Sequence, residues 1–394
     1  MLERQEAMLK KEKRVFILGA PGFPRGSAGA NYDQYLALAL LKAGWKVVIL
    51  GKGANRQEDK VGSAYIYKQI EYRNEKPTKV EKYGMTKKFY IEMYKEYKMT
   101  RDDYYILHDI GWRAQSWLAR KIGTEHMSYI HYEDLLPIQY RHYLINPRYW
   151  GMVFKWEFKL NSVPKALPIS EKLRSVEIEH GCKNTLILPI MSDPDEFGEA
   201  KRAFKPQILK FIYSGAKANT HEDDLTLLFQ ALQMLADHEK KKIEIHITGM
   251  REEKLKEKVG NSELLKELPV KVHGWMKYNE LIDLYREMDF LALPRFKNGV
   301  TEANFPSKIP ESLSFGIIPV CSKVGDYTKT YLKDGYNSFL FKTGNVNECV
   351  RAIRKALNIT EEDYLKMRGN ARRTAVEEFG YENWSERISH FLIE

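Results

Sequence analysis

The chain has 394 residues, of which 43% are hydrophobic and 29% charged, and its net charge is +10. This composition excludes disordered and fibrous proteins, and at roughly 150 residues per domain the length predicts two or three domains, with two the simpler arrangement. Three scattered cysteines (Cys182, Cys321 and Cys349) exclude a disulfide framework and favour a reducing compartment. Because no apolar run reaches the roughly 18 residues of a membrane span, we expect a cytoplasmic chain, either free or peripheral on the inner face of a membrane.

The first half of the chain alternates short β-branched strands with longer helices. Its expected strands are residues 14–20, 45–51, 104–109, 127–132 and 185–190. The segment 28–44 places apolar side chains at helical spacing and ends at Gly44, a residue typical of helix C-caps. Strands that alternate with helices predict parallel βαβ units.

The second half repeats this pattern. Its expected strands are residues 208–215, 242–249, 270–274, 289–294, 317–322 and 338–341. Its expected helices are residues 223–240, 279–288, 308–316 and 347–358. Three prolines and several acidic residues interrupt the pattern at 188–207 and predict a hinge. We therefore expect an α/β protein of two open, doubly wound, Rossmann-like domains, with the site at the carboxyl ends of the strands, in the cleft between the domains.

Positive charge is concentrated in the first half. Basic residues alternate with tyrosines from Lys60 to Tyr105, and a second such segment spans 139–159. These mixtures suit a phosphate-rich partner, either nucleic acid or an anionic membrane surface. The alternative is a solvated helix face with its aromatic side chains turned into the core.

A glycine-rich turn at residues 19–31 follows the first strand and opens the first long helix. Its residues Gly26, Ser27 and Gly29 let the backbone approach a ligand, and a helix N-terminus offers N–H groups to an anion. A dinucleotide fold requires G-x-G-x-x-G and an acidic residue after the second strand, and neither is present, which argues against a dehydrogenase. The alternative is a purely structural turn.

Two histidines end consecutive expected strands of the first half. His108 and Asp109 end one strand, and His131 ends the next, shortly before Glu133 and Asp134. A histidine at this edge can donate a hydrogen bond to a substrate hydroxyl or phosphate oxygen, and His131 is the stronger candidate. The alternative is a structural, hydrogen-bonded histidine.

The stretch 302–320 combines two glutamates and a lysine at a strand-to-helix corner. A short helix is expected from Pro306 to Phe315, with Lys308 in its first turn and Glu311 one turn later on nearly the same face. A cation beside free N–H groups suits a diphosphate, and a carboxylate suits the vicinal hydroxyls of a ribose. The alternative is an ordinary surface Lys–Glu pair.

Taken together and in order, several segments resemble the GT-B glycosyltransferases of the large retaining family 4. These segments are the glycine-rich turn, 186–197 with the hinge, 213–219, 272–294, 302–320, 324–357 and the last 20 residues, 375–394. The resemblance implies an acceptor domain at 1–190, a nucleotide-sugar donor domain at 207–375, and a C-terminal helix at 376–394 that crosses back to the first domain.

The resemblance also implies roles for individual residues. It assigns Glu311 to the nucleotide ribose and Lys308 to the diphosphate, next to Gly215 and Ser307. It places Glu302 near the donor sugar, His131 near the reacting end of that sugar, and Gly26 to Gly29 near the diphosphate.

Two features depart from the family pattern. Glu302 and Glu311 are separated by one residue more than the family's paired glutamates, and Ala216 stands where the family has an arginine. Lys217 and Arg295 are the expected substitutes for the missing charge.

The implied activity is transfer of a sugar from a nucleoside diphosphate donor to an acceptor hydroxyl with retention, as in polysaccharide or glycoconjugate assembly. No cofactor and no metal are expected, and the acceptor is expected to be a glycan or a lipid-linked glycan rather than nucleic acid. The alternatives are a silent GT-B protein or a basic nucleic-acid-binding module, and a non-hydrolysing nucleotide-sugar epimerase.

Overall fold

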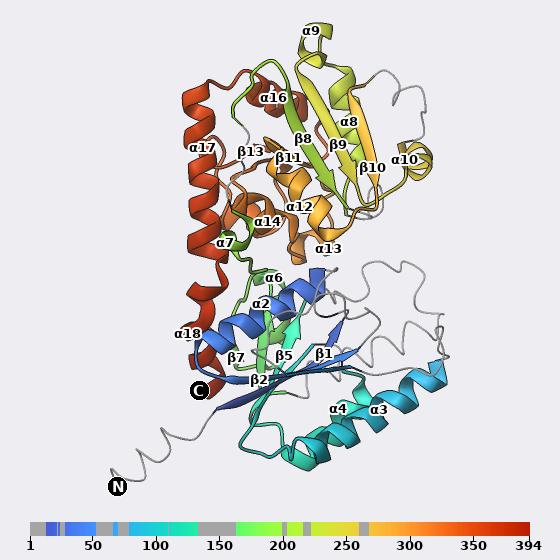
Figure 1. Cartoon of the computed structure of the whole chain (residues 1–394), viewed down its shortest axis with the longest axis vertical. Coiled ribbons are helices and arrows are strands. Elements are labelled where there is room, and N and C mark those ends of the chain that lie inside the picture. The colour runs from blue at the N-terminus through green and yellow to red at the C-terminus, as the bar shows by residue number, and fades with distance from the viewer. Residues whose placement is uncertain are drawn as a thin grey trace. The chain divides into compact units, whose positions relative to one another are not determined.

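The structure is a computed structural model, shown in Figure 1. It describes residues 13–21, 23, 28–52, 66–69, 79–108, 110–132, 163–198, 203–215, 222–259 and 268–394. The chain divides into two compact units. The first unit consists of the described residues up to Met191 together with Tyr381–Glu394, and the second unit is Ser192–Gly380. Residues 376–380, which the sequence groups with the C-terminal helix, therefore lie in the second unit.

The first unit contains a parallel sheet. Its described strands are β1 (Arg14–Pro21), β2 (Lys46–Lys52), β3 (Ile66–Gln69), β4 (Tyr104–Leu107), β5 (Met127–His131), β6 (Lys165–Pro168) and β7 (Asn184–Thr185). They lie in the order β3-β2-β1-β4-β5-β6-β7, so the order reverses between β1 and β4. Neither β3 nor β6, each four residues long, is among the strands expected from the sequence.

Helices cover this sheet. They are α2 (Ala28–Lys42), α3 (Lys79–Glu96), α4 (Trp112–Ile122), α6 (Glu171–Glu179) and α18 (Tyr381–Ile393). Helix α2 ends as expected, since Gly44 adopts a positive φ of 81°. The apolar side chains of β1 are fully buried between the helices, and Phe16 stacks on Tyr105 at a centroid distance of 5.4 Å.

The C-terminal helix α18 returns to the first unit, which confirms the expected crossing. It packs against α2. The indole N–H of Trp45 donates to Ser389 Oγ at 2.9 Å. Lys165 Nζ donates to the carbonyl oxygens of Phe391 (3.2 Å) and Leu392 (2.7 Å), so a cation satisfies the carboxyl end of the helix.

The second unit contains a second parallel sheet. Its strands are β8 (Leu209–Ser214), β9 (Ile243–Thr248), β10 (Val270–Gly274), β11 (Phe290–Leu293), β12 (Ile318–Ser322) and β13 (Phe339–Phe341). The order is β10-β9-β8-β11-β12-β13, with the reversal between β8 and β11. All six expected strands are confirmed, because each is a β-branched or aromatic run bounded by turn residues.

The helices of the second unit follow the sequence less closely. They are α7 (Pro194–Phe197), α8 (Leu225–Gln233), α9 (Asp237–Lys240), α10 (Glu252–Val259), α12 (Tyr278–Arg286), α13 (Gly299–Ala303), α14 (Lys308–Ser314), α15 (Tyr327–Thr330), α16 (Val346–Leu357), α17 (Glu361–Thr374) and the π-helical turn η2 (Ala375–Phe379). The single helix expected at 223–240 is wrong: it divides into α8 and α9, since the Glu239 carboxylate accepts the Ala236 N–H (2.8 Å) and starts a new helix. Helix α14 begins at Lys308 rather than Pro306, with Ser307 as its N-cap.

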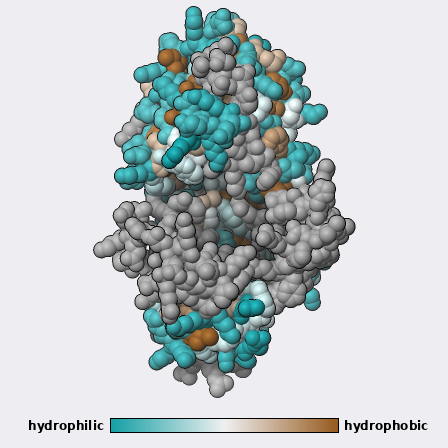
Figure 2. All heavy atoms as spheres, turned by 90° about the vertical axis from the view of Figure 1, so that its right-hand side faces the viewer, coloured by the Kyte–Doolittle hydropathy of each residue, from teal (hydrophilic) through white to brown (hydrophobic). Residues whose placement is uncertain are grey.

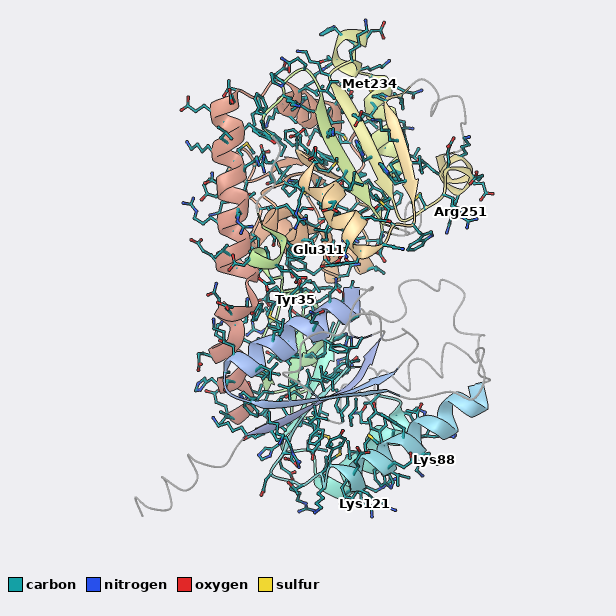
Figure 3. The ribbon with its side chains drawn as sticks, viewed as in Figure 1. Tyr35, Lys88, Lys121, Met234, Arg251 and Glu311 are labelled. Atoms are coloured by element: carbon teal, nitrogen blue, oxygen red, sulfur yellow. The ribbon has the colours of Figure 1, made fainter. Side chains whose placement is uncertain are left out.

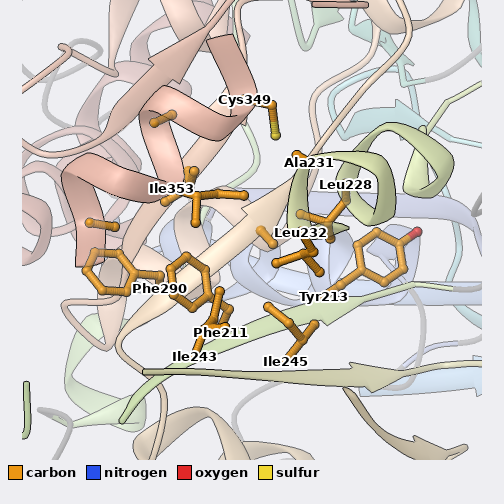
Figure 4. Packing of buried hydrophobic residues seen from close by; sticks show 14 of the residues in the cluster. Phe211, Tyr213, Leu228, Ala231, Leu232, Ile243, Ile245, Phe290, Cys349 and Ile353 are labelled. Atoms are coloured by element: carbon orange, nitrogen blue, oxygen red, sulfur yellow. The ribbon is translucent and has the colours of Figure 1, made fainter. Parts of the chain in front are cut away.

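A large apolar core joins α8 and α16 to this sheet (Figure 4). Phe211 of β8 stacks on Phe290 of β11 at 4.8 Å, Ile353 of α16 lies next to this pair, and Leu228 of α8 lies beside Tyr213. Fully burying one such side chain contributes about 1.5–3 kcal/mol. This core fixes the neighbouring strands β8 and β11, whose carboxyl ends carry the candidate site.

The surface of the second unit that carries α10 and β10 is largely hydrophilic (Figure 2). Exposed apolar side chains there are scattered singly, as on an ordinary globular surface. None of the helices in the described ranges is long and apolar enough to cross a membrane.

Candidate functional site

The site is built where the sheet of the second unit reverses its order. The segment after β8 and the segment after β11 hydrogen-bond to each other: the Asp224 N–H donates to Pro294 O, and the Phe296 N–H donates to Glu222 O, both at 2.9 Å. This short antiparallel pairing sets Asp223 opposite Arg295. Ligands of open α/β sheets bind at such a reversal, beyond the carboxyl ends of the strands.

Arg295 is the centre of a buried charge cluster. Its side chain is 1% exposed. Nε donates to Asp223 Oδ1 (3.1 Å), Nη1 to Asn304 Oδ1 (2.9 Å) and Nη2 to Glu222 Oε2 (3.1 Å). Its backbone N–H donates to Ser322 Oγ at 2.8 Å. The guanidinium therefore holds the loop acids in place, and its nitrogens are bonded inside the protein.

Asp223 contacts both Arg295 and Lys308, the residue that the sequence assigns to the diphosphate. Its Oδ2 accepts from Lys308 Nζ and from the hydroxyl of Tyr213, both at 2.8 Å. Burial by itself raises the pKa of a carboxyl group, but the positive charges of Lys308 and Arg295 outweigh it and hold the pKa of Asp223 below its ordinary value. Asp223 is therefore an ionised carboxylate with both oxygens engaged.

Lys308 lies at the carboxyl end of β8. Its Nζ is 4.7 Å from the ring centroid of Tyr213, and a Cβ placed on Gly215 would come within 2.7 Å of the same nitrogen. The glycine thus leaves the space that the ammonium occupies. The Lys308 side chain is 18% exposed, so the cation is partly accessible while its partner Asp223 is buried.

Glu311 lies one turn along α14 from Lys308 (Figure 3). Its backbone N–H donates to the carbonyl of Ser307 at 3.2 Å, which closes the first turn of the helix. Burial, and then the charge of Glu311, raise the pKa of the neighbouring Tyr285 hydroxyl. Lys308 and Glu311 therefore sit in one corner, as the sequence predicts.

Glu302 occupies a different environment. It lies on α13, is 41% exposed, and pairs with the exposed Lys297 at 3.6 Å. The structure does not bring it into contact with the Lys308–Asp223–Arg295 cluster. Its assignment to the donor sugar stays a prediction.

In the first unit, His131 forms a buried pair with Glu177. His131 ends β5, and Glu177 lies on α6, which follows the neighbouring strand β6. His131 Nδ1 lies 2.7 Å from Glu177 Oε1, and the two side chains are 0% and 1% exposed. A carboxylate on one ring nitrogen fixes the orientation of an imidazole.

His108 forms a second pair, with Asp33. Its Nδ1 is 2.8 Å from both Asp33 oxygens. Asp33 lies on α2 after β1, and His108 follows β4, so this pair sits at the order reversal of the first sheet. Burial raises the pKa of Asp33, although the His108 charge opposes the shift. The rings of Tyr32 and Tyr132 lie 5.5 Å apart beside it.

Sequence reasoning missed the acidic members of all three groups. Glu177 lies one turn after the buried Leu173, and Asp33 lies one turn before the buried Ala37. A charged residue on the apolar stripe of a helix is a signal of a buried partner. Asp223 is adjacent to Asp224, whose side chain accepts the Leu227 N–H at 3.1 Å as an N-cap, so the acidic run resembles an ordinary helix start.

Several predicted residues fall outside the described ranges. They are Gly26, Ser27, Asp109, Glu133, Asp134 and Lys217. Gly29 is the second residue of α2. Within the described residues, no group of three or more His, Cys, Asp or Glu side chains is arranged to hold a metal ion.

Comparison with known proteins addresses the second unit directly. Residues 200–374 match the family model described as "Glycosyl transferases group 1". No curated protein matches the chain in sequence.

Solved structures resemble the chain over nearly its whole length. A sucrose-phosphate synthase from Thermosynechococcus elongatus has 13% identity and a TM-score of 0.71, with 96% of this chain and 98% of that chain covered. A glycosyltransferase from Rickettsia africae has 13% identity and a TM-score of 0.67, with coverages of 97% and 98%. The Anabaena protein HepE, solved with UDP and glucose, has 14% identity and a TM-score of 0.67, with coverages of 97% and 100%. At these identities the likeness shows the fold, which is the expected two-domain GT-B arrangement of Rossmann-like units.

Proposed function

We propose that this chain, a glycosyltransferase with a group 1 domain at residues 200–374, moves a sugar from a nucleoside diphosphate to an acceptor hydroxyl with retention of configuration. The observation that carries the proposal is the corner formed by α14. There, the ammonium of Lys308 is held at the carboxyl end of β8, and Glu311 lies one turn away.

The chemistry of the leaving group explains why a fixed cation is needed. As the bond between the sugar and the diphosphate breaks, negative charge grows on a phosphate oxygen. A cation already fixed in place stabilises that charge without reorganising at the moment of reaction. Lys308 meets this condition because Asp223 holds its Nζ at 2.8 Å. Arg295 acts through Asp223 in this proposal, since its own nitrogens are bonded within the protein.

Glu311 is assigned to the ribose. A carboxylate only accepts hydrogen bonds, so it suits two neighbouring hydroxyl groups that both donate. Its closeness to Lys308 along one helix matches the closeness of a ribose to its diphosphate. Gly215 and Ser307 flank the same corner, and Lys217 is proposed as a second cation.

His131 is assigned to the sugar and acceptor side of the reaction. The buried Glu177 engages its Nδ1, which fixes the ring. A histidine so oriented can form a hydrogen bond to a hydroxyl of the reacting sugar. Transfer with retention then uses a donor phosphate oxygen to take the acceptor proton, so the carboxylates position the substrate.

Fewer observations support the proposed donor and acceptor classes. HepE, one of the similar structures, was solved with UDP and glucose, so UDP-sugars are the first donors to test. The basic, tyrosine-rich segments from Lys60 to Tyr105 and at 139–159 support an acceptor presented at an anionic membrane surface, such as a lipid-linked glycan. The proposed location is the cytoplasmic face of that membrane.

One observation favours a second candidate, a GT-B protein without turnover. In the described cluster, Asp223 and Glu222 neutralise the two cations Lys308 and Arg295. Such a site holds less free positive charge for a diphosphate than a pair of unpaired cations does.

The test is a panel of UDP-, GDP- and ADP-sugars with glycan and lipid-linked acceptors. Release of nucleoside diphosphate is measured, and proton NMR identifies the anomer formed first. The proposal predicts acceptor-dependent release and a product with the configuration of the donor. Inversion would exclude retention, donor turnover without acceptor would favour an epimerase, and binding without turnover would favour the silent protein.

A further inference from the structure

We propose that Asp223 is a positioning residue, which holds the ammonium of Lys308 in place for the phosphate of the donor. This inference rests on the proposed function and deepens it, because it names how the phosphate-binding cation is oriented.

Asp223 is itself fixed from several directions. Its backbone belongs to the short ladder between the segments after β8 and β11. Oδ1 accepts from Arg295 Nε at 3.1 Å, and Oδ2 accepts from the Tyr213 hydroxyl at 2.8 Å. The side chain is 3% exposed. These contacts hold the carboxylate in place, so the fold sets the direction from which Oδ2 contacts Lys308.

The bond to Lys308 transmits this order to a side chain that is otherwise flexible. Lysine has a long stem with several rotatable bonds, and ordering it costs conformational entropy. The Asp223 contact at 2.8 Å and the Tyr213 ring at 4.7 Å confine Nζ above Gly215. An ammonium has three donor hydrogens, and the observed bond to Asp223 uses one of them. The others leave Nζ able to bind a phosphate without losing Asp223.

Asp223 and Lys308 differ in solvent exposure, as expected if the acid positions the lysine. Asp223 and Arg295 are buried, whereas the Lys308 side chain keeps 18% of its surface exposed. The acid therefore contacts the cation from inside the protein, and a ligand reaches it from the solvent side. Protein kinases use the same logic, in which a glutamate orients the lysine that binds the nucleotide phosphates.

A double-mutant cycle tests the inference. The affinity for the nucleoside diphosphate that binds the wild-type chain most tightly is measured by calorimetry for the wild type, Asp223→Asn, Lys308→Met and the double variant. We expect about a tenfold loss of affinity for Asp223→Asn, which is about 1.4 kcal/mol, and a larger loss for Lys308→Met. In the Lys308→Met background, Asp223→Asn should change affinity less than about twofold, because the group that it positions is absent.

A second variant covers the case in which Asp223→Asn does not fold. Tyr213→Phe removes only the hydroxyl that donates to Asp223 Oδ2 and keeps the ring beside Lys308. It should weaken nucleotide binding about threefold in the wild-type background and leave binding unchanged in the Lys308→Met background.

The outcomes separate the inference from the proposed function. An equal loss in both backgrounds would show that Asp223 is only structural. Tighter binding by Asp223→Asn would show that the acid competes with the phosphate for Lys308. Either result would overturn the inference and leave the glycosyltransferase proposal standing. If no nucleoside diphosphate or nucleotide sugar binds the wild-type chain, both proposals fail.

Discussion

Each of the two sheets carries a buried aspartate where its strand order reverses, and the two aspartates behave in opposite ways. In the first unit Asp33 meets His108 at 2.8 Å, and burial raises the pKa of its carboxyl group. In the second unit Asp223 meets Arg295 at 3.1 Å and Lys308 at 2.8 Å, and the two cations lower its pKa in spite of burial. The same topology thus positions a carboxyl group in both units, and the amount of positive charge beside it decides whether burial or attraction sets the direction of its pKa shift.

This difference separates two kinds of chemistry. Arginine and lysine stay charged near neutral pH, so the Asp223 cluster has a fixed distribution of charge, as stabilisation of a leaving diphosphate requires. The Asp33–His108 and Glu177–His131 pairs instead combine a carboxylate with an imidazole, whose ring nitrogens can form hydrogen bonds to hydroxyl groups of a sugar or an acceptor.

The largest expected effect is on stability, from Asp223→Asn. The change leaves the buried Arg295 with one charged partner, and breaking a buried pair costs about 3–5 kcal/mol. We expect the free energy of unfolding, measured by urea titration at pH 7, to fall by about 3 kcal/mol. A fall below about 1 kcal/mol would show that the cluster does not hold the loops together.

The sign of the pH dependence follows from the lowered pKa of Asp223. Its contribution to stability is present above the ordinary aspartate pKa of about 4. It is lost only as the pH falls through the lower native value. The difference between wild type and Asp223→Asn should therefore be constant from about pH 5.5 to 8.

Glu177→Gln tests the histidine pair of the first unit. Glutamine keeps the size of the side chain but removes the charge that engages His131 Nδ1. We expect kcat/KM to fall about 10- to 100-fold, or about 1.4–2.8 kcal/mol, with unaltered nucleotide affinity. Glu179→Gln on the exposed face of α6 is the matched control and should leave both unchanged. Equal losses in the two variants would refute the positioning of His131.

Gly215→Ala tests whether the phosphate binds beside Lys308 in the second unit. The added Cβ would lie 2.7 Å from Lys308 Nζ, so the flexible lysine moves and the fold stays intact. Nucleotide affinity should fall about tenfold, which is about 1.4 kcal/mol, with little change in melting temperature. Gly369→Ala on the exposed face of α17 is the control, since a Cβ there meets no atom within 4 Å and should stabilise the helix by about 0.5–1 kcal/mol. Unchanged nucleotide affinity in Gly215→Ala would place the phosphate elsewhere.

The smallest expected effect is from Asp33→Asn. Because burial raises the native pKa of Asp33, the stability associated with its protonated form is present at low pH and is lost as the pH rises through that value. Asparagine, which is neutral and of similar size, should therefore lower the free energy of unfolding by less than about 1 kcal/mol at pH 7. As the pH rises, the variant should become more stable relative to the wild type. A loss as large as that of Asp223→Asn would remove the contrast between the two units.

Much of the fold could be read from the sequence, and the reasons are local. The strands of the second unit are rich in β-branched and aromatic residues and lie between turn residues, so each can be recognised on its own. Strands β3 and β6 are four residues long, and their pairing to β2 and β5 is what makes them strands. A single sequence carries no signal of such pairing.

The site residues also fall into two groups, those that are close in sequence and those that only the fold brings together. Lys308 and Glu311 share one helix, so their closeness follows from spacing alone. The bond between Lys308 and Asp223 joins residues 85 positions apart, and that between Arg295 and Asp223 joins residues 72 apart. Arg295 was predicted as a cation for the donor, but its burial among Asp223, Glu222 and Asn304 is a tertiary property. Residues with roles that depend on distant partners were therefore the ones that the sequence missed or assigned incompletely.

Calorimetric titration of the wild-type chain and of Lys308→Met with UDP, GDP, ADP and CDP tests whether Lys308 binds the phosphates of the donor. Lys355→Met is the matched control, because Lys355 forms an exposed pair with Asp334 at 3.1 Å. We expect that one nucleoside diphosphate binds the wild type and the control alike, and that Lys308→Met weakens this binding at least about 30-fold, or about 2 kcal/mol. Equal affinity in all three proteins, or no binding in any, would contradict this expectation.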